Sequence, residues 1–229
     1  MKNIVVFSGA GISKESGIST FRDADGLWEK HRIEDVANFD CWKKNPDLVR
    51  NFYNQRLKNL LSVEPNMAHK DLVRLEEFFN VDIITQNVDD LHQRAGSSRV
   101  IHLHGELKKA RSVRNPSYIV DIKKGFLSKD DKDPYGEPLR PHIVWFGEAV
   151  PMMENAISIT QKADIFIVIG SSLVVYPAAG LIHYTKKDCK KFLVDPLNVD
   201  VRGQNIEVIQ EKATIGVRKV VDEILLNYK

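Results

Sequence analysis

The fold is decided near the N-terminus, where residues 4–13 are Ile4-Val5-Val6-Phe7-Ser8-Gly9-Ala10-Gly11-Ile12-Ser13. The apolar run predicts a buried first strand, and because it passes straight into a glycine loop it is not the pattern of a signal peptide. Gly9 and Gly11 permit a tight turn and a close approach of a pyrophosphate, onto which a following helix would direct its N–H groups. Lys14 stands where the usual dinucleotide-binding pattern has a third glycine, so a plain tight turn is the alternative.

Four more apolar runs predict buried strands, at residues 81–85, 165–169, 192–194 and 206–209. Helical periodicity separates them, most clearly at residues 66–79 and 213–228. Because strand and helix alternate, the sequence predicts an α/β fold with a parallel sheet covered on both faces.

Two stretches interrupt this alternation. Residues 23–63 contain no convincing strand, and their best element is a helix opened by Asn45-Pro46. Residues 108–141 are rich in charge, proline and glycine, and a mobile surface loop is the alternative there. We predict one unit over 1–229, with a large domain of residues 1–22, 64–107 and 142–229. Two insertions, 23–63 and 108–141, form a smaller module beside it.

Composition excludes several classes of protein. With 229 residues, 43% hydrophobic and 28% charged, wholesale disorder is excluded. The net charge of +2 argues against a protein that coats nucleic acid, and no apolar run approaches the roughly 18 residues of a membrane span. Only Cys41 and Cys189 are present, which excludes a disulfide framework. We expect a soluble, cytoplasmic protein that binds neither nucleic acid nor membranes.

Polar or glycine-rich residues follow several predicted strands, at the edge where open α/β sheets bind ligands. Gln86, Asn87 and Asp89 follow residues 81–85, although capping of the next helix is an alternative for the last two. His104 precedes Gly105, whose missing side chain leaves room for a ligand, so this histidine is a candidate base. The segments 144–148 and 169–172 repeat the pattern, which predicts a shared cleft.

Taken together, the motifs resemble the sirtuins, a family of NAD-dependent protein lysine deacylases. The resemblance extends from about residue 4 to the last predicted helix. It implies a Rossmann-type large domain and a small module made from two insertions. It rests on Gly9-Ala10-Gly11-Ile12-Ser13, Gly17-Ile18, Thr20-Phe21-Arg22, Gln86-Asn87-Val88-Asp89, Leu91-His92, Ala95-Gly96, His104-Gly105-Glu106-Leu107, Phe146-Gly147-Glu148 and Gly170-Ser171-Ser172.

The resemblance implies two sets of binding residues and a base. His104 would be the general base, with Asn87 as the second catalytic residue, and residues 20–28 would form a loop that closes over the nicotinamide ribose. An extended substrate peptide would lie along Val144, Phe146, Gly147 and Glu148 by strand addition. The implied NAD-binding residues are Gly9, Ala10, Gly11, Ile12, Ser13, Thr20, Phe21, Arg22, Trp28, Gln86, Asn87, Val88, Asp89, Gly170, Ser171, Ser172, Asp195 and Ala213.

The implied reaction consumes NAD as a cosubstrate. Nicotinamide leaves, the acyl oxygen of the substrate lysine captures the ribose, and His104 removes a proton from a ribose hydroxyl that attacks the acyl carbon. The products are nicotinamide, free lysine and O-acyl-ADP-ribose. The alternatives are a protein mono-ADP-ribosyltransferase, a non-catalytic NAD-binding sensor and a dehydrogenase. Asn87, Asp89 and His104 favour the deacylase, because a pure binder needs no base.

The second insertion departs from the family pattern. Most sirtuins carry two cysteine pairs that bind structural zinc there, but residues 108–141 contain no cysteine. Tetrahedral zinc needs four ligands, so we predict no metal, and this insertion must be held by packing or be partly mobile. Asp195 stands where many relatives have asparagine.

Residues on the helix after Pro46 indicate which acyl groups the protein removes. Tyr53 and Arg56 lie three residues apart on the helix after Pro46, and with Ala24 they resemble the acyl-pocket signature of the subgroup that removes succinyl and malonyl groups. An arginine beside a phenol can bind a carboxylate, and a small Ala24 leaves room for a longer chain. A core tyrosine and a solvated arginine are the structural alternative. We predict removal of succinyl and malonyl groups alongside acetyl groups.

Overall fold

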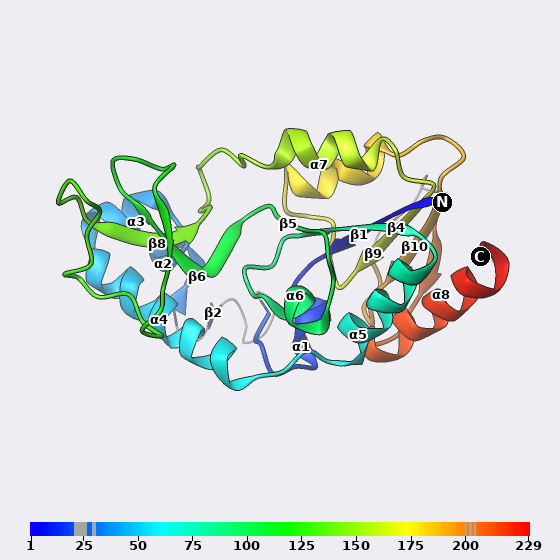
Figure 1. Ribbon diagram of the computed structural model, residues 1–229, viewed down its shortest axis with the longest axis horizontal. Coiled ribbons are helices and arrows are strands. Elements are labelled where there is room, and N and C mark those ends of the chain that lie inside the picture. The colour runs from blue at the N-terminus through cyan, green and yellow to red at the C-terminus, as the bar shows by residue number, and fades with distance from the viewer. Residues whose placement is uncertain (21–26, 29–30, 200, 202, 204) are drawn as a thin grey trace.

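The larger part of the chain is a six-stranded parallel sheet with strand order β11-β10-β9-β1-β4-β5 (Figure 1). This computed structural model describes residues 1–20, 27–28, 31–199, 201, 203 and 205–229, with the side chains of 27–34 outside the description. The strands are β1 (Asn3–Ser8), β4 (Asn80–Thr85), β5 (Val100–His102), β9 (Ile165–Ile169), β10 (Lys190–Val194) and β11 (Glu207–Ile209). The predicted parallel sheet is confirmed.

Helices cover both faces of this sheet, because alternate residues of each strand point to opposite sides. Ile4 and Val6 of β1 pack on α5 (Met67–Val73) and α8 (Ala213–Asn227). Val5 and Phe7 pack toward α7 (Met153–Thr160) and the 3₁₀ helix η2 (Ala178–Tyr184). Within the described residues, no helix has the length and apolar character needed to cross a membrane.

The chain reverses its direction of travel across the sheet at β1. From β1 it passes to β4 on one side and later returns to β9 on the other. In open α/β sheets such a switch point opens a crevice at the carboxyl ends of the strands, where ligands bind. The loops after β1, β4 and β9 therefore meet at this crevice.

The remaining elements form a smaller module on the left of Figure 1. The first insertion contributes α2 (Ile33–Val36), α3 (Phe39–Lys44), α4 (Pro46–Ser62) and two short strands, β2 (Leu27–Trp28) and β3 (His31–Arg32). The second contributes a three-stranded antiparallel sheet of order β7-β6-β8, with β6 (Gly105–Ser112), β7 (Ile119–Asp121) and β8 (Leu139–Ile143). The exact division into domains stays a prediction.

Several local expectations are confirmed and others are wrong. The predicted helix start at Asn45-Pro46 is confirmed, since Asn45 Oδ1 accepts from Leu48 N at 3.0 Å. The predicted helix 66–79 is too long, because it ends at Val73 and continues as the 3₁₀ helix η1 (Arg74–Glu77). The expectation of no strand in 23–63 is also wrong, because β2 and β3 are too short to leave a period-two pattern.

Side chains fix the second insertion, both to α4 and within itself. Asn54 of α4 makes two hydrogen bonds to Leu127, accepting from its N–H at 2.8 Å and donating to its C=O at 2.9 Å. Asp133 accepts from Ser112 Oγ at 2.7 Å, and from the backbone N–H groups of Tyr135 and Glu137 at 2.9 Å each. The buried Leu127 side chain packs with residues of β6 and β8. The insertion is therefore held by packing and by polar ties.

We expect the purified protein to contain no stoichiometric zinc, and a chelator to change neither its thermal unfolding nor its activity. Cys41 lies in α3 and Cys189 just before β10. No cluster of three or more possible metal ligands occurs in the described part of the chain. Elemental analysis that finds one zinc per chain would contradict this prediction.

Asn54→Ala should lower the free energy of unfolding by ~1–3 kcal/mol, because it leaves two buried backbone groups without a hydrogen-bond partner.

Candidate functional site

Two glycine loops meet at the carboxyl ends of β1 and β9. Gly11 N donates to Gly170 O at 3.0 Å, and Gly9 N donates to Ile169 O at 2.9 Å. A Cβ on Gly11 would lie 2.5 Å from Gly170 Cα, and one on Gly9 would lie 2.7 Å from Gly170 O. Gly170 has φ +60°, a conformation that glycine adopts without strain. Only glycines allow the two loops to pack this closely.

The rest of the first loop turns its side chains inward. Ile12 lies in the hydrophobic core, so only its main chain faces the crevice. Ser13 Oγ donates to Asp89 Oδ2 at 3.0 Å and accepts from Asn87 Nδ2 at 3.2 Å. Asn87 Nδ2 also donates to Gly9 O at 3.1 Å. The structure thus joins the polar residues after β4 to the glycine loop.

Asp89 contacts both the glycine loop and the start of the next helix, the two alternatives that the sequence left open. One of its oxygens holds Ser13, and the other accepts from Leu91 N at 3.2 Å at the start of α6 (Leu91–Ala95). Burial raises the pKa of Asp89, against the opposing effect of these hydrogen bonds. The neighbouring Val88 is half-buried and packs with the small-module core. Asp89 therefore accepts from the first N–H of α6, whose N-cap position is Asp90, and is a buried carboxyl group beside the crevice.

A chain of buried polar groups lies behind Asn87, and sequence reasoning missed it. Asn87 N donates to Thr85 Oγ1 at 3.0 Å, Ser8 Oγ donates to Thr85 Oγ1 at 2.9 Å, and His92 Nε2 lies 2.9 Å from Ser8 Oγ. Burial lowers the pKa of His92, so the ring is neutral and can donate from Nε2. Polar residues at buried strand ends, Ser8 and Thr85, were the signal available in the sequence.

Further predicted residues lie along the same edge. Gln86 Nε2 donates to Ser171 Oγ at 2.9 Å, which links the ends of β4 and β9. Gly170 N donates to Val194 O at 2.9 Å, which brings Asp195 next to this loop. The Asp195 carboxylate accepts from Leu197 N at 2.9 Å, so it stabilises its own turn. Ser172 follows in the loop after β9, and Ala213 begins α8.

His104 lies in the turn between β5 and β6. Its Nδ1 is 3.0 Å from Gln86 O, so the neutral ring carries its proton on Nδ1 and keeps Nε2 as a proton acceptor. Burial lowers the pKa of His104, which favours this neutral form. Val144 N donates to His104 O at 2.9 Å, which fixes the residues after β8 beside the histidine.

The interpretation of Gly105 needs correction. A Cβ there would lie 2.0 Å from His142 O, and the residue has φ +83°. The missing side chain therefore makes room for the neighbouring strand β8 and not for a ligand.

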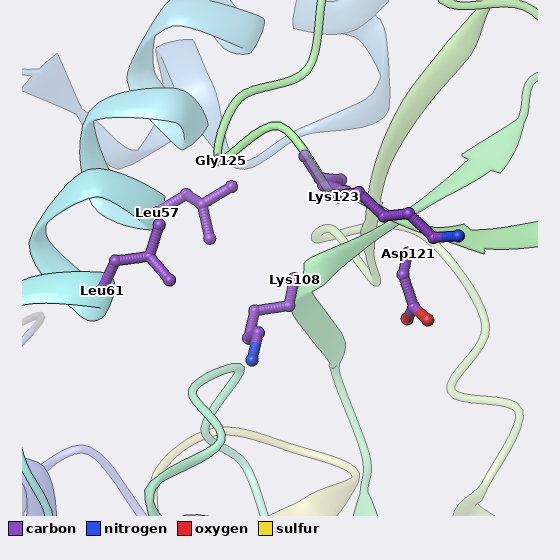
Figure 2. A pocket seen from close by; sticks show the side chains of 7 residues that line it. Leu57, Leu61, Lys108, Asp121, Lys123 and Gly125 are labelled. Carbon is purple, nitrogen blue, oxygen red and sulfur yellow. The ribbon is translucent and has the colours of Figure 1, made fainter.

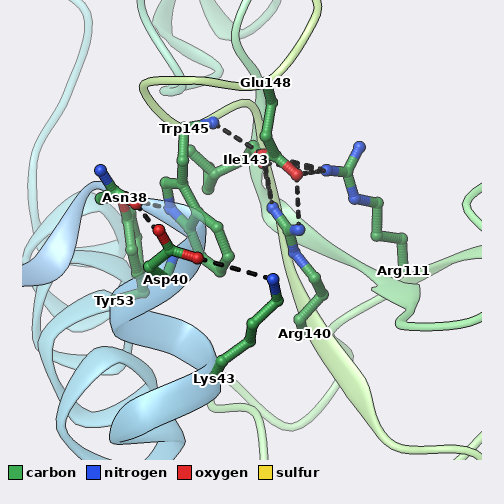
Figure 3. A network of polar contacts seen from close by, with 9 residues as sticks. All are labelled: Asn38, Asp40, Lys43, Tyr53, Arg111, Arg140, Ile143, Trp145 and Glu148. Atoms are coloured by element: carbon green, nitrogen blue, oxygen red, sulfur yellow. Dashed lines mark hydrogen bonds and ion pairs between the residues drawn. The ribbon is translucent and has the colours of Figure 1, made fainter.

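The residues of the predicted acyl pocket are buried. Tyr53 and Arg56 lie on α4 with 3% and 8% exposed, which excludes the alternative of a solvated arginine. Tyr53 Oη accepts from Trp145 Nε1 at 2.9 Å (Figure 3). Phe146 is 51% exposed and its N–H donates to Ala37 O at 3.0 Å.

Glu148 has its carboxylate occupied within the protein. It accepts from both terminal nitrogens of Arg140, at 2.7 and 2.8 Å, and from Arg111 and Trp145 N (Figure 3). The Glu148 side chain is therefore not available to a peptide, and its N–H donates to Trp145 O at 3.0 Å. Among the other predicted residues, Thr20 is buried, while Phe21, Arg22, Ala24 and the side chain of Trp28 lie outside the described residues.

A cavity of about 400 Å³ lies elsewhere, between α4 and the β6–β7 sheet (Figure 2). None of the predicted site residues lines it, and one of its lysines, Lys108, pairs with Asp90 at 2.9 Å. The lining residues are Leu57, Leu61, Lys108, Asp121, Ile122, Lys123 and Gly125.

Comparison with known proteins shows the family to which the chain belongs. The model of the Sir2 family matches residues 9–177. An NAD-dependent protein deacylase of Bacteroides thetaiotaomicron is 53% identical over 226 residues, covering 96% of this chain and 97% of that protein. A Sir2 homologue in complex with NAD has a TM-score of 0.88 at 35% identity, covering 98% of this chain and 90% of that chain. A Sir2 structure with a deacetylated p53 peptide and 3′-O-acetyl-ADP-ribose has a TM-score of 0.81 at 33% identity, covering 96% and 92%.

These similarities extend over nearly the whole chain, and the chain therefore belongs to the Sir2 family. It is an NAD-dependent protein deacylase, for which NAD is a cosubstrate and acylated proteins are the substrates.

Proposed function

We propose that this deacylase removes acidic acyl groups, succinyl and malonyl, as well as acetyl groups from protein lysines. The observation that carries the proposal is the joint burial of Tyr53 and Arg56, one turn apart on α4. Burial raises the pKa of Tyr53 to about 12, so its hydroxyl stays neutral and can donate, and the nearby Arg56 charge opposes this shift. A phenol donor beside a guanidinium is suited to a carboxylate.

The burial of Tyr53 and Arg56 favours an acyl group that ends in a carboxylate over an acetyl group. Water screens a guanidinium at the protein surface, whereas a guanidinium at low local dielectric binds an anion more strongly. A terminal carboxylate on the acyl chain supplies that anion, and an acetyl group does not. The helix α4 places both side chains, so the spacing of the donors is fixed by one helical turn.

We propose that NAD binds along the edge where β1, β4 and β9 end. The mutual contacts of Gly9, Gly11 and Gly170 support this, because a Cβ on any of them would collide with the opposite loop and push apart the ends of β1 and β9. Asn87 and Asp89 would hold the nicotinamide side of the site, and Gln86 with Ser171 the ribose side, supported by their hydrogen bonds across the strand ends. NAD supplies the ADP-ribose that accepts the acyl group.

His104 is the proposed general base. Its Nδ1 is engaged with Gln86 O, so Nε2 is the atom that takes the proton of a ribose hydroxyl. The substrate peptide is proposed to pair with the main chain around Phe146 and Gly147, whose exposure supports access.

The test compares two peptides that differ only in the acyl group. The protein is incubated with NAD and either succinyl-lysine or acetyl-lysine peptide, and nicotinamide and O-acyl-ADP-ribose are followed by mass spectrometry. We expect kcat/KM for the succinyl peptide to equal or exceed that for the acetyl peptide. A succinyl value below about a tenth of the acetyl value, a loss of more than ~1.4 kcal/mol, would contradict the acidic-acyl proposal. ADP-ribose left on the peptide would instead indicate a ribosyltransferase.

A further inference from the structure

Trp145 lies where the helices of the small module meet its three-stranded sheet. On the helical side, the rings of Trp42, Tyr53 and Phe39 lie 5.9, 6.1 and 6.4 Å from its ring. On the sheet side, the guanidinium carbon of Arg140 lies 3.6 Å from the ring centroid. The side chain is 2% exposed. Together these contacts hold the indole in one orientation.

The indole N–H determines what the Tyr53 hydroxyl can do. Trp145 Nε1 donates to Tyr53 Oη at 2.9 Å. A phenol has one proton to donate and an oxygen that accepts, so an N–H on the oxygen directs the phenol proton away from Trp145. Among the residues that the structure describes, no acceptor takes that proton. The hydroxyl is therefore left as a buried donor that an incoming acceptor can satisfy.

We infer that Trp145 is a positioning residue for acyl selection: it fixes the Tyr53 hydroxyl as a donor to the carboxylate of a succinyl or malonyl group. This inference rests on the proposed function, because that function supplies the carboxylate. Without the indole N–H, the hydroxyl could rotate, and its oxygen would lose a buried partner. Trp145 itself does not contact the acyl group in this scheme.

An ion-pair network in turn holds Trp145 (Figure 3). Arg140 forms a two-bond pair with Glu148, at 2.7 and 2.8 Å, which fixes the guanidinium plane above the indole. Glu148 also accepts from Trp145 N at 2.9 Å and from Arg111 at 3.1 Å. Since Arg111 lies in β6 and Arg140 in β8, the sheet of the second insertion supports the residue that orients the acyl pocket.

Trp145→Phe tests this role, because it removes the N–H and keeps an aromatic ring under Arg140. We expect the ratio of kcat/KM for succinyl-lysine over acetyl-lysine peptide to fall about 3- to 10-fold, the scale of one hydrogen bond, mainly through a higher KM for the succinyl peptide. The matched control is Trp42→Phe, a buried tryptophan of the same cluster, which should change the ratio less than ~2-fold. In a Tyr53→Phe background, Trp145→Phe should lower the ratio no further.

The outcomes distinguish a failure of this inference from a failure of the acidic-acyl function on which it rests. If Arg56→Met lowers the ratio and Trp145→Phe does not, the positioning role of Trp145 is overturned and the acidic-acyl function stands. If Arg56→Met leaves the ratio unchanged, the acidic-acyl function itself fails. A ratio lowered equally by Trp42→Phe would show that general packing is responsible, and would also overturn the positioning role.

A second measurement needs no variant at Trp145. The chain has three tryptophans, so nitrogen-15 spectra of the protein bound to ADP-ribose, which cannot react with the peptide, contain three indole N–H signals. Trp28→Phe and Trp42→Phe identify the Trp145 signal by elimination. Succinyl-lysine peptide should shift that signal more than acetyl-lysine peptide, because only the succinyl carboxylate engages the bonded Tyr53 hydroxyl. Equal shifts with both peptides would overturn the inference.

Discussion

His104→Ala is expected to lower acyl transfer by at least about 10²-fold, the usual scale for loss of a general base, while NAD still binds. The variant leaves no group to accept the ribose proton, because Nε2 of His104 is the proposed acceptor and its Nδ1 is held by Gln86 O. The glycine loops after β1 and β9 are unaffected. Single-turnover formation of O-acyl-ADP-ribose measures the loss, and titration calorimetry measures NAD binding.

His102 offers a matched control for this variant. Its Nδ1 lies 3.0 Å from Asn87 O, and His104 makes the same kind of contact with the carbonyl oxygen of the preceding residue, Gln86. His102→Ala should therefore lose much less activity than His104→Ala. Wild-type turnover in His104→Ala would remove that residue from the mechanism.

The pH profile gives an independent check on the same residue. Burial lowers the pKa of His104 from the ordinary 6.5, so the free base persists below that pH. The acid limb of kcat/KM should accordingly have its midpoint below 6.5. A midpoint above that value would assign the limb to another group.

Arg56→Met should lower kcat/KM for succinyl-lysine peptide roughly 10- to 100-fold, since a charge-assisted hydrogen bond is worth about 1.5–3 kcal/mol. Methionine keeps a long apolar side chain in the buried position and removes the charge. An acetyl group has no carboxylate to lose, so the value for acetyl-lysine peptide should fall much less. The ratio of the two values is the decisive quantity, because a folding defect lowers both.

Arg50 provides the matched control for Arg56. It lies on the same helix with the same 8% exposure, but it pairs with Asp47 and its guanidinium lies over the ring of Trp42. Arg50→Met therefore removes a buried charge of α4 away from the proposed pocket. We expect it to lower both kcat/KM values together, and a selective loss on the succinyl peptide would contradict the special role of Arg56.

The large domain could be predicted from the sequence because its signals are local. The central strands β1 and β9 are buried on both faces, so runs such as residues 165–169 are wholly apolar. The glycine loop follows its strand directly, and Asn87 and Asp89 follow theirs. The carboxyl ends of neighbouring parallel strands meet at one edge, which is why the sequence alone was enough to group these residues.

The small-module sheet could not be predicted in the same way. In this sheet β6 carries Lys108 and Lys109, and β8 carries a buried arginine, so neither strand shows an apolar run. Arg140 looks like a surface charge until it is placed beside Glu148. Trp145 and Tyr53 are 92 residues apart in the chain, so their hydrogen bond leaves no local pattern.

The ties made by Asn54 and Asp133 have a consequence for the conditions in which the enzyme keeps its shape. Thiolate ligands are destroyed by oxidants and lose their metal when it is scarce, whereas an amide and a carboxylate are chemically inert to both. The hydrogen bond from Ser112 and the backbone bonds lower the pKa of Asp133, so acidification does not readily break its ties. We therefore expect the second insertion, which contains no cysteine, to keep its shape under oxidising conditions and where zinc is scarce.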